Sequence, residues 1–187
     1  MRERFRAFGL LAIVCLLSFL VLSELDARLN STRRQFEKSF ALQDFRRVLP
    51  DFDNDPVLDV VTLVDPSGTK RKFYRASKAG RFVGAIFPVR SDGYRAAVSL
   101  LAGVDFNGRI SRIVLSEPAD AMIFGAPGLS DQWLLQFKNL NASQIKPKET
   151  GGTIEAIPGL SMTAVRVTDA IREAVQFFSD YKSKIAR

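Results

Sequence analysis

The residues best suited to chemistry lie between Glu155 and Thr163, where Ser161 and Thr163 follow a Pro158-Gly159 turn. The sequence after this turn predicts a helix that begins at these two hydroxyls. The first N–H groups of a helix have no intrahelical partner and lie at the positive end of its dipole, so they attract anions. The stretch is therefore a candidate phosphate site. A simpler interpretation is that Ser161 or Thr163 only caps the helix, as serine and threonine commonly do.

Two helices are expected to position this stretch. Apolar residues recur at steps of three or four over residues 162–181, which predicts a helix with one buried face. A shorter helix is expected to begin at Ser130. Within it, Trp133 and Phe137 are four residues apart, a spacing typical of core packing rather than of stacking on a ligand. Residues 139–152 are polar and are expected at the surface.

The remaining segments have the alternation and boundaries of β-strands. Asn107-Gly108 joins the last two of them, and this dipeptide is the strongest short signal for a hairpin. Strands followed by helices predict an α+β fold with a mainly antiparallel sheet. The expected strands cover residues 57–64, 71–76, 82–89, 97–105 and 109–115.

Composition excludes several classes of function. The chain has no histidine and one cysteine, Cys15, so histidine-based triads and His/Cys metal sites are excluded. The net charge is +7, but residues 1–50 hold nine Lys/Arg against five Asp/Glu (+4), while residues 51–187 hold eighteen against fifteen (+3). Much of the excess therefore flanks an apolar N-terminal run, where anionic lipid is the expected counter-charge. We expect no nucleic-acid partner, and no residue spacing points to a hydrolase.

The run from Ala7 to Ser23 is uncharged and strongly apolar. As a helix it would span about 26 Å, close to the lower limit for a bilayer core. Residues 1–23 are predicted to be a cytoplasmic tip and transmembrane anchor, because the arginines before the run keep the N-terminus inside. A cleaved signal peptide is the alternative. Residues 24–50 are expected to form a helical stalk, and residues 51–187 a periplasmic domain at a bacterial inner membrane.

Three segments in this order resemble the G subunit of the Rnf electron-transport complex and the related C subunit of the sodium-translocating NADH:quinone oxidoreductase. Residues 93–115 are similar to the family's Gly-Tyr opening, apolar strand, Asp-x-x-Gly turn and second strand. Residues 130–137 resemble its Trp-x-x-x-Phe helix, and residues 155–163 resemble its flavin-attachment segment. The resemblance covers nearly the whole chain and implies a domain of the FMN-binding type.

In this family the hydroxyl before the last helix carries FMN through a phosphoester bond, so the resemblance implies covalent FMN at Ser161. The attachment segment departs from the family pattern at four positions: Glu155 replaces an aspartate, Pro158 a hydroxyl residue, Leu160 an alanine and Ser161 a threonine. The sequence from Glu117 also replaces a glycine-rich flavin loop. Leu160 is expected to hinder attachment or packing of the flavin. The resemblance also places other residues at the cofactor: Tyr94, Glu117, Gly159, Leu160, Met162 and Thr163.

The resemblance implies an electron-transfer subunit that is not catalytic alone. It would pass electrons through FMN between a ferredoxin or NAD side and membrane partners, coupled to ion translocation. Its partners would be other membrane and redox subunits of an Rnf-type complex, together with the lipid bilayer. Two alternatives stay open: a flavin-free structural subunit of the same complex, and an anchored periplasmic binding or assembly module without a redox role.

Overall fold

The computed structural model describes residues 42–65, 68–93, 97–116 and 129–187. Its centre is an antiparallel sheet in which each strand pairs with the next one along the chain, in the order β1-β2-β3-β4-β5. The described part therefore has the α+β architecture with an antiparallel sheet that the sequence predicts. The strands are β1 (Val60–Val64), β2 (Lys70–Lys78), β3 (Arg81–Asp92), β4 (Ala97–Asp105) and β5 (Ile110–Leu115).

Local sequence accounts for the boundaries of these strands. β1 begins three residues later than expected, because the N–H of Asp59 bonds to the carbonyl of Pro56 (3.2 Å) in a turn. Between β4 and β5 the chain turns at the predicted Asn107-Gly108. There Gly108 has φ +78° and donates to the carbonyl of Asp105 (3.0 Å), which confirms the hairpin.

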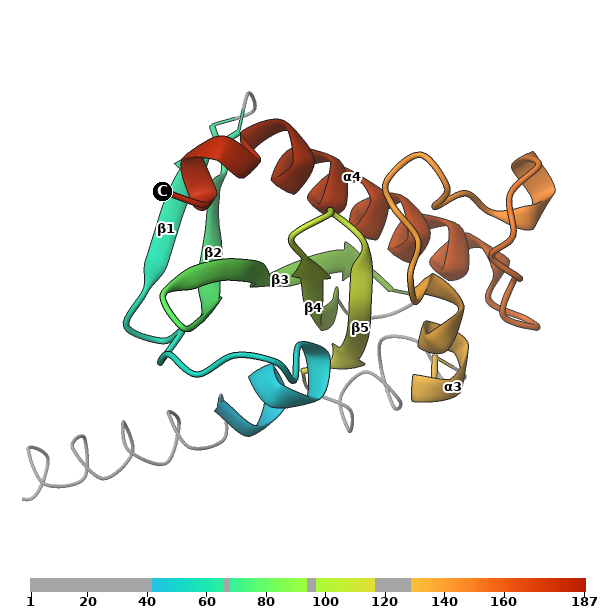
Figure 1. Cartoon of the computed structure of the whole chain (residues 1–187). Coiled ribbons are helices and arrows are strands. Elements are labelled where there is room, and N and C mark those ends of the chain that lie inside the picture. Colours follow the sequence, from blue (N-terminus) through green and yellow to red (C-terminus); the bar gives the residue numbers. More distant parts are fainter. Residues whose placement is uncertain (1–41, 66–67, 94–96, 117–128) are drawn as a thin grey trace, which may run out of the picture. The chain divides into compact units, whose positions relative to one another are not determined.

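The long helix α4 (Ser161–Ile185) covers one face of the sheet (Figure 1). It extends the predicted helix by about a turn at its C-terminal end. Aromatic side chains fill the space between helix and sheet: Phe73 of β2 lies 5.9 Å from Phe177, and Phe87 of β3 lies 6.4 Å from Phe178, between ring centroids. Burial of such side chains contributes about 1.5–3 kcal/mol each, so this layer stabilises the packing of helix on sheet.

The opposite face of the sheet is covered in part by residues 42–52, of which 42–48 are helical. Phe45, Val48 and Leu49 are buried there against Ile86 of β3 and its neighbours. The last turns of the predicted stalk thus belong to the folded domain, which begins near residue 41 rather than at residue 51. The stalk prediction for residues 24–41 lies outside the described residues.

A short helix and irregular segments complete the domain. α3 (Asp131–Leu134) begins as expected at Ser130, whose Oγ accepts a bond from the N–H of Trp133 (3.3 Å). It continues into the 3₁₀ turn η2 (Leu135–Phe137), and a second 3₁₀ turn, η3 (Lys148–Thr150), follows. The expectation that residues 139–152 lie at the surface is wrong in part. Ala142 and Ile145 are buried in the core, because this stretch closes the edge of the sheet beside β5.

Among the described residues, none of the helices has both the length and the apolar character needed to cross a membrane. The predicted anchor at residues 1–23 lies outside the described part of the chain.

Candidate functional site

α4 begins at Ser161, and Leu160 occupies the N-cap position. The carbonyl of Leu160 accepts the first helical bond, from the N–H of Ala164 (3.0 Å), and no side chain caps the helix. The interpretation of Ser161 or Thr163 as the N-cap is therefore wrong. Because no side-chain cap bond is made at this helix end within the described part of the chain, the first N–H groups of α4 are candidates to bind an anion.

The two hydroxyls of the candidate site face in different directions. Ser161 and Met162 are exposed, whereas Thr163 is only 4% exposed. Two residues along a helix correspond to a rotation of about 200°, so one hydroxyl faces solvent when the other faces the core. Ser161 is thus the accessible hydroxyl, and the Thr163 side chain belongs to the packed side of α4.

The turn before α4 explains three of the residues singled out in the sequence. The N–H of Leu160 bonds to the carbonyl of Ile157 (2.9 Å), with Pro158 and Gly159 between them. Gly159 has φ +76°, as the third position of a type II turn requires, and no atom lies within 4 Å of a Cβ built there. Gly159 is therefore needed for its backbone angle. The Leu160 side chain is half-buried and packs against the core; its expected effect on flavin attachment stays a prediction.

Glu155, at the start of the segment, is held from three sides. Its carbonyl accepts a bond from Nε1 of Trp133 (2.8 Å), and its N–H donates to Oε1 of Gln136 (2.8 Å). Its carboxylate pairs with Nζ of Lys148 (3.0 Å), a contact between exposed groups that contributes little on its own. The two backbone bonds therefore tie the segment before Ser161 to α3 and η2.

Trp133 and Phe137 pack in the core, as predicted. Phe137 is fully buried, Trp133 is 9% exposed, and their rings meet edge to face at 5.2 Å. The indole has little surface left for stacking on a ligand. Sequence reasoning found the packing but not the bond to Glu155, and it missed Gln136, because long-range hydrogen bonds of this kind leave no periodic signal.

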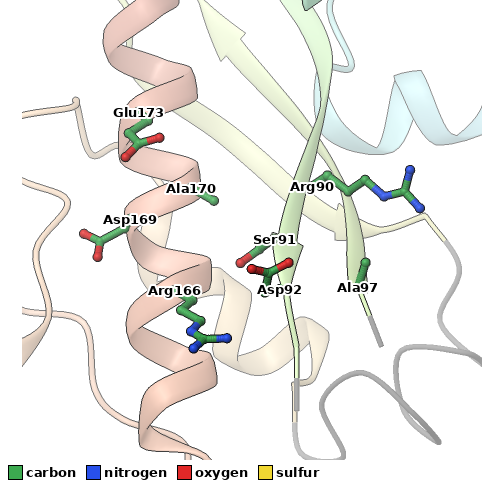
Figure 2. Close-up of a pocket in the computed structure, with 8 residues that line it drawn as sticks. All are labelled: Arg90, Ser91, Asp92, Ala97, Arg166, Asp169, Ala170 and Glu173. Atoms are coloured by element: carbon green, nitrogen blue, oxygen red, sulfur yellow. The ribbon is translucent and has the colours of Figure 1, made fainter. Parts of the chain in front are cut away.

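A cleft of about 600 Å³ lies between the end of β3 and the N-terminal half of α4 (Figure 2). Ser91 and Ala170 face one another across it, and Arg166 points toward the strand from the helix, whereas Asp169 points away. Arg166 follows Ser161 by five residues, about 7.5 Å along the helix axis. The residues that line the cleft include positively and negatively charged side chains and no aromatic ring. Sequence reasoning missed this cleft, since a packed strand end and a helix face meet only in three dimensions.

The other two candidate positions, Tyr94 and Glu117, lie outside the described residues. Most of the loop that replaces the glycine-rich flavin loop also lies outside them. The structure thus brings together Gly159, Leu160, Ser161 and Met162 at one helix end. The Thr163 side chain is buried, while its N–H belongs to the first turn of the same helix.

Comparison with known proteins places this chain in a family. The G subunit of the ion-translocating oxidoreductase complex of Salmonella typhi is 30% identical over 172 residues, which cover 80% of this chain and 81% of that protein. The chain belongs to this family of G subunits. The protein of the same name from Vibrio cholerae (strain ATCC 39541) is 25% identical over 170 residues, covering 81% of this chain and 79% of its own length.

A third relative matches over a shorter stretch. The G subunit of the proton-translocating ferredoxin:NAD(+) oxidoreductase complex of Clostridium ljungdahlii is 28% identical over 110 residues, 57% of this chain. The matched part spans 60% of that relative. No protein-family model matches the chain. Family membership confirms the resemblance inferred from the three sequence segments.

Proposed function

We propose that this protein is a membrane-anchored electron-transfer subunit of an Rnf-type ion-translocating oxidoreductase complex, with FMN attached to Ser161. Family membership supports a place in such a complex, because the relatives are named as its G subunit. The proposed partners are the other membrane and redox subunits. The single observation that carries the cofactor is the accessible Ser161 hydroxyl at the uncapped end of a 25-residue helix.

The residues at this helix end fit the phosphate end of FMN. Ser161 Oγ supplies the ester oxygen, and the N–H groups of the first turn of α4 stabilise the remaining phosphate charge. The half-buried Leu160 side chain packs against the core beside this helix end and leaves the Ser161 hydroxyl exposed.

When bound, FMN supplies one-electron redox chemistry. The contribution of the chain is to hold the flavin at a fixed place on a rigid helix, since α4 is packed along its length against the sheet. The bonds from Trp133 and Gln136 to Glu155 fix the segment that leads into this helix. Electron transfer to the partners then depends on where the domain is held relative to them.

Residues 1–23 are proposed to anchor the domain in a bacterial inner membrane, with the N-terminus in the cytoplasm and the domain in the periplasm. The basic start and the charge-free run that follows support this assignment. The anchor would hold the domain beside its membrane partners, so a small electron-transfer domain needs no large interface of its own.

A flavin-free structural subunit of the same complex is the alternative. The replacement of a hydroxyl residue by Pro158 and the changed sequence from Glu117 favour it. Under this alternative the domain keeps its fold and its membership of the complex, and Ser161 remains an unmodified hydroxyl.

The test is the intact mass of the full chain purified from its native membrane under denaturing conditions. We expect a mass increase of one FMN less one water, and we expect Ser161→Ala to abolish it. Ser183→Ala is the matched control, because it makes the same change at an exposed serine on the same helix. An unmodified wild-type chain, or a modification that persists in the Ser161→Ala chain, contradicts the attachment. Cleavage after the apolar run would appear in the same spectrum as a lower mass.

A further inference from the structure

β1 is the edge strand of the sheet, and no other strand of the described chain lies on its outer side. Its register with β2 places Val60 opposite Tyr74, Thr62 opposite Lys72 and Val64 opposite Lys70. The other edge differs. The segment after η2 pairs with Ile110 of β5. The N–H of Asn139 donates to the carbonyl of Ile110 (2.7 Å), and the N–H of Ile110 donates to the carbonyl of Leu140 (2.9 Å). Within the described residues, the β5 edge is thus paired at Ile110, and no backbone bond is made on the outer side of β1.

The backbone bonds at both ends of β1 show which of its residues face outward. Arg75 donates to the carbonyl of Asp59 (2.9 Å), and Asp65 donates to the carbonyl of Thr69 (3.0 Å), both in the register of the strand pair. In an antiparallel pair, bonded and non-bonded positions alternate. The odd-numbered residues of β1 therefore bond to β2. The N–H and C=O groups of residues 60, 62 and 64 point away from the sheet.

The side chains along this edge are unusually apolar for an exposed strand. Leu58 is 73% exposed, Val60 39% and Val64 56%. They make up three of the six large hydrophobic side chains exposed in the described part of the chain. β1 carries no charge, proline or bulge, the devices by which open edges commonly avoid pairing. Its composition instead suits the addition of a strand.

The charge beside this edge is positive. Lys70 and Lys72 are exposed on β2, on the face that carries the side chains of Val60 and Val64. The acids at the ends of β1 are already paired: Asp65 with Arg71 (2.9 Å), and Asp59 with Arg75. Thr62 is small and stands between Lys72 and the open edge, so the long lysine side chain can reach across it to an acidic neighbour.

We propose that the β1 edge binds an extended, acidic segment of another subunit, which adds to the sheet as a sixth strand. Such a segment satisfies the outward backbone groups of residues 60, 62 and 64 and pairs its carboxylates with Lys70 and Lys72. A bilayer surface fits less well, because it leaves backbone groups without partners. A second copy also fits less well. Antiparallel pairing centred on Thr62 would set Asp59 of one copy opposite Asp65 of the other, and it brings no acid to the lysines.

This inference goes beyond the proposed function and depends on it only for the existence of partner subunits. The test uses the full chain in detergent micelles with two peptide probes, acetyl-Val-Glu-Val-Glu-Val-amide and its Glu→Lys counterpart. We expect the acidic peptide to bind and to slow hydrogen exchange at the amides of residues 60, 62 and 64. We expect the lysine peptide to leave them unchanged.

Thr62→Pro separates edge pairing from folding. It removes only an outward N–H, a change that edge strands tolerate, and we expect about tenfold weaker binding of the acidic peptide. Thr62→Ala keeps the N–H and is the matched control. Reversing Lys70 and Lys72 to glutamate should transfer binding to the lysine peptide.

Equal binding by Thr62→Pro, or acidic-peptide binding without protection of the three amides, overturns the proposal. Protection of the three amides by higher protein concentration alone would indicate self-pairing and also overturns the proposal. Protection by anionic phosphatidylglycerol vesicles alone would indicate a lipid partner and overturns it as well. The flavin readout at Ser161 is independent of each of these outcomes, so failure here is distinguishable from failure of the proposed function.

Discussion

The bond from Trp133 to Glu155 is the contact through which the fold most directly supports the candidate site, and Trp133→Phe tests it. The substitution keeps an aromatic ring against Phe137 but removes the indole N–H that reaches the Glu155 carbonyl at 2.8 Å. A hydrogen bond of this kind contributes about 1 kcal/mol net. The smaller ring leaves a gap in a side chain that is only 9% exposed, which costs about 1–2 kcal/mol more.

We therefore expect the free energy of unfolding to fall by about 2–3 kcal/mol, which lowers the urea midpoint by about 1 M. Far-UV circular dichroism is the suitable probe, because Trp133 is the only tryptophan and its fluorescence disappears with the substitution. Native-state hydrogen exchange should also show faster exchange at the amides of Glu155 and Leu160, because both belong to the segment that the indole holds.

Gln136→Met supplies the coupling control, since it removes the other backbone bond to Glu155. The double variant should lose less stability than the sum of the single losses, because both bonds hold one residue. The reasoning is refuted if Trp133→Phe unfolds at the wild-type midpoint, or if its faster exchange spreads evenly over the domain and leaves Glu155 and Leu160 no more affected than the sheet.

Two further predictions concern the scaffold. Gly103→Ala would place a Cβ 2.4 Å from the carbonyl oxygen of Val48, so we expect the free energy of unfolding in urea to fall by about 1–3 kcal/mol. Hydrogen exchange should become faster in residues 42–52. An unchanged urea midpoint would contradict the close packing of this segment. Ala79→Asn should raise the free energy of unfolding by about 0.5 kcal/mol. Ala79 has φ +50° in the two-residue turn between β2 and β3, where asparagine is favoured. A lower thermal midpoint would contradict this turn conformation.

Local signals explain why parts of the fold could be predicted from sequence. The turn chemistry of Asn107-Gly108 acts within four residues, so the β4–β5 hairpin was predictable before any tertiary contact was known. The length of α4 follows from a sustained periodicity of apolar residues. Both features depend on neighbours in the chain and needed no knowledge of packing partners.

Non-local packing explains the parts that could not be predicted. Residues 42–50 carry an amphipathic pattern that suits a free stalk and a helix lying on a sheet equally well. Close packing decides between them, because Val48 approaches Gly103 of β4 and Leu49 approaches Gly84 of β3. No sequence pattern indicates the role of Gln136, because that role depends on a single long-range hydrogen bond to Glu155. The cleft beside Arg166 likewise arises from a strand end and a helix face that are far apart in sequence.

The departures from the family's attachment motif differ in how much they change the structure of this segment. Leu160 looked most damaging in the sequence because its side chain is large; in the structure it is half-buried and packs against the core, and its effect on flavin attachment stays a prediction. Pro158 takes the first inner position of the turn, where its fixed φ is suitable, so the hydroxyl it replaces is not needed to form the turn. Thr163 is turned into the core. Ser161 is thus the hydroxyl of this segment that a phosphate can reach, and a single substitution there decides between a flavin carrier and a structural subunit.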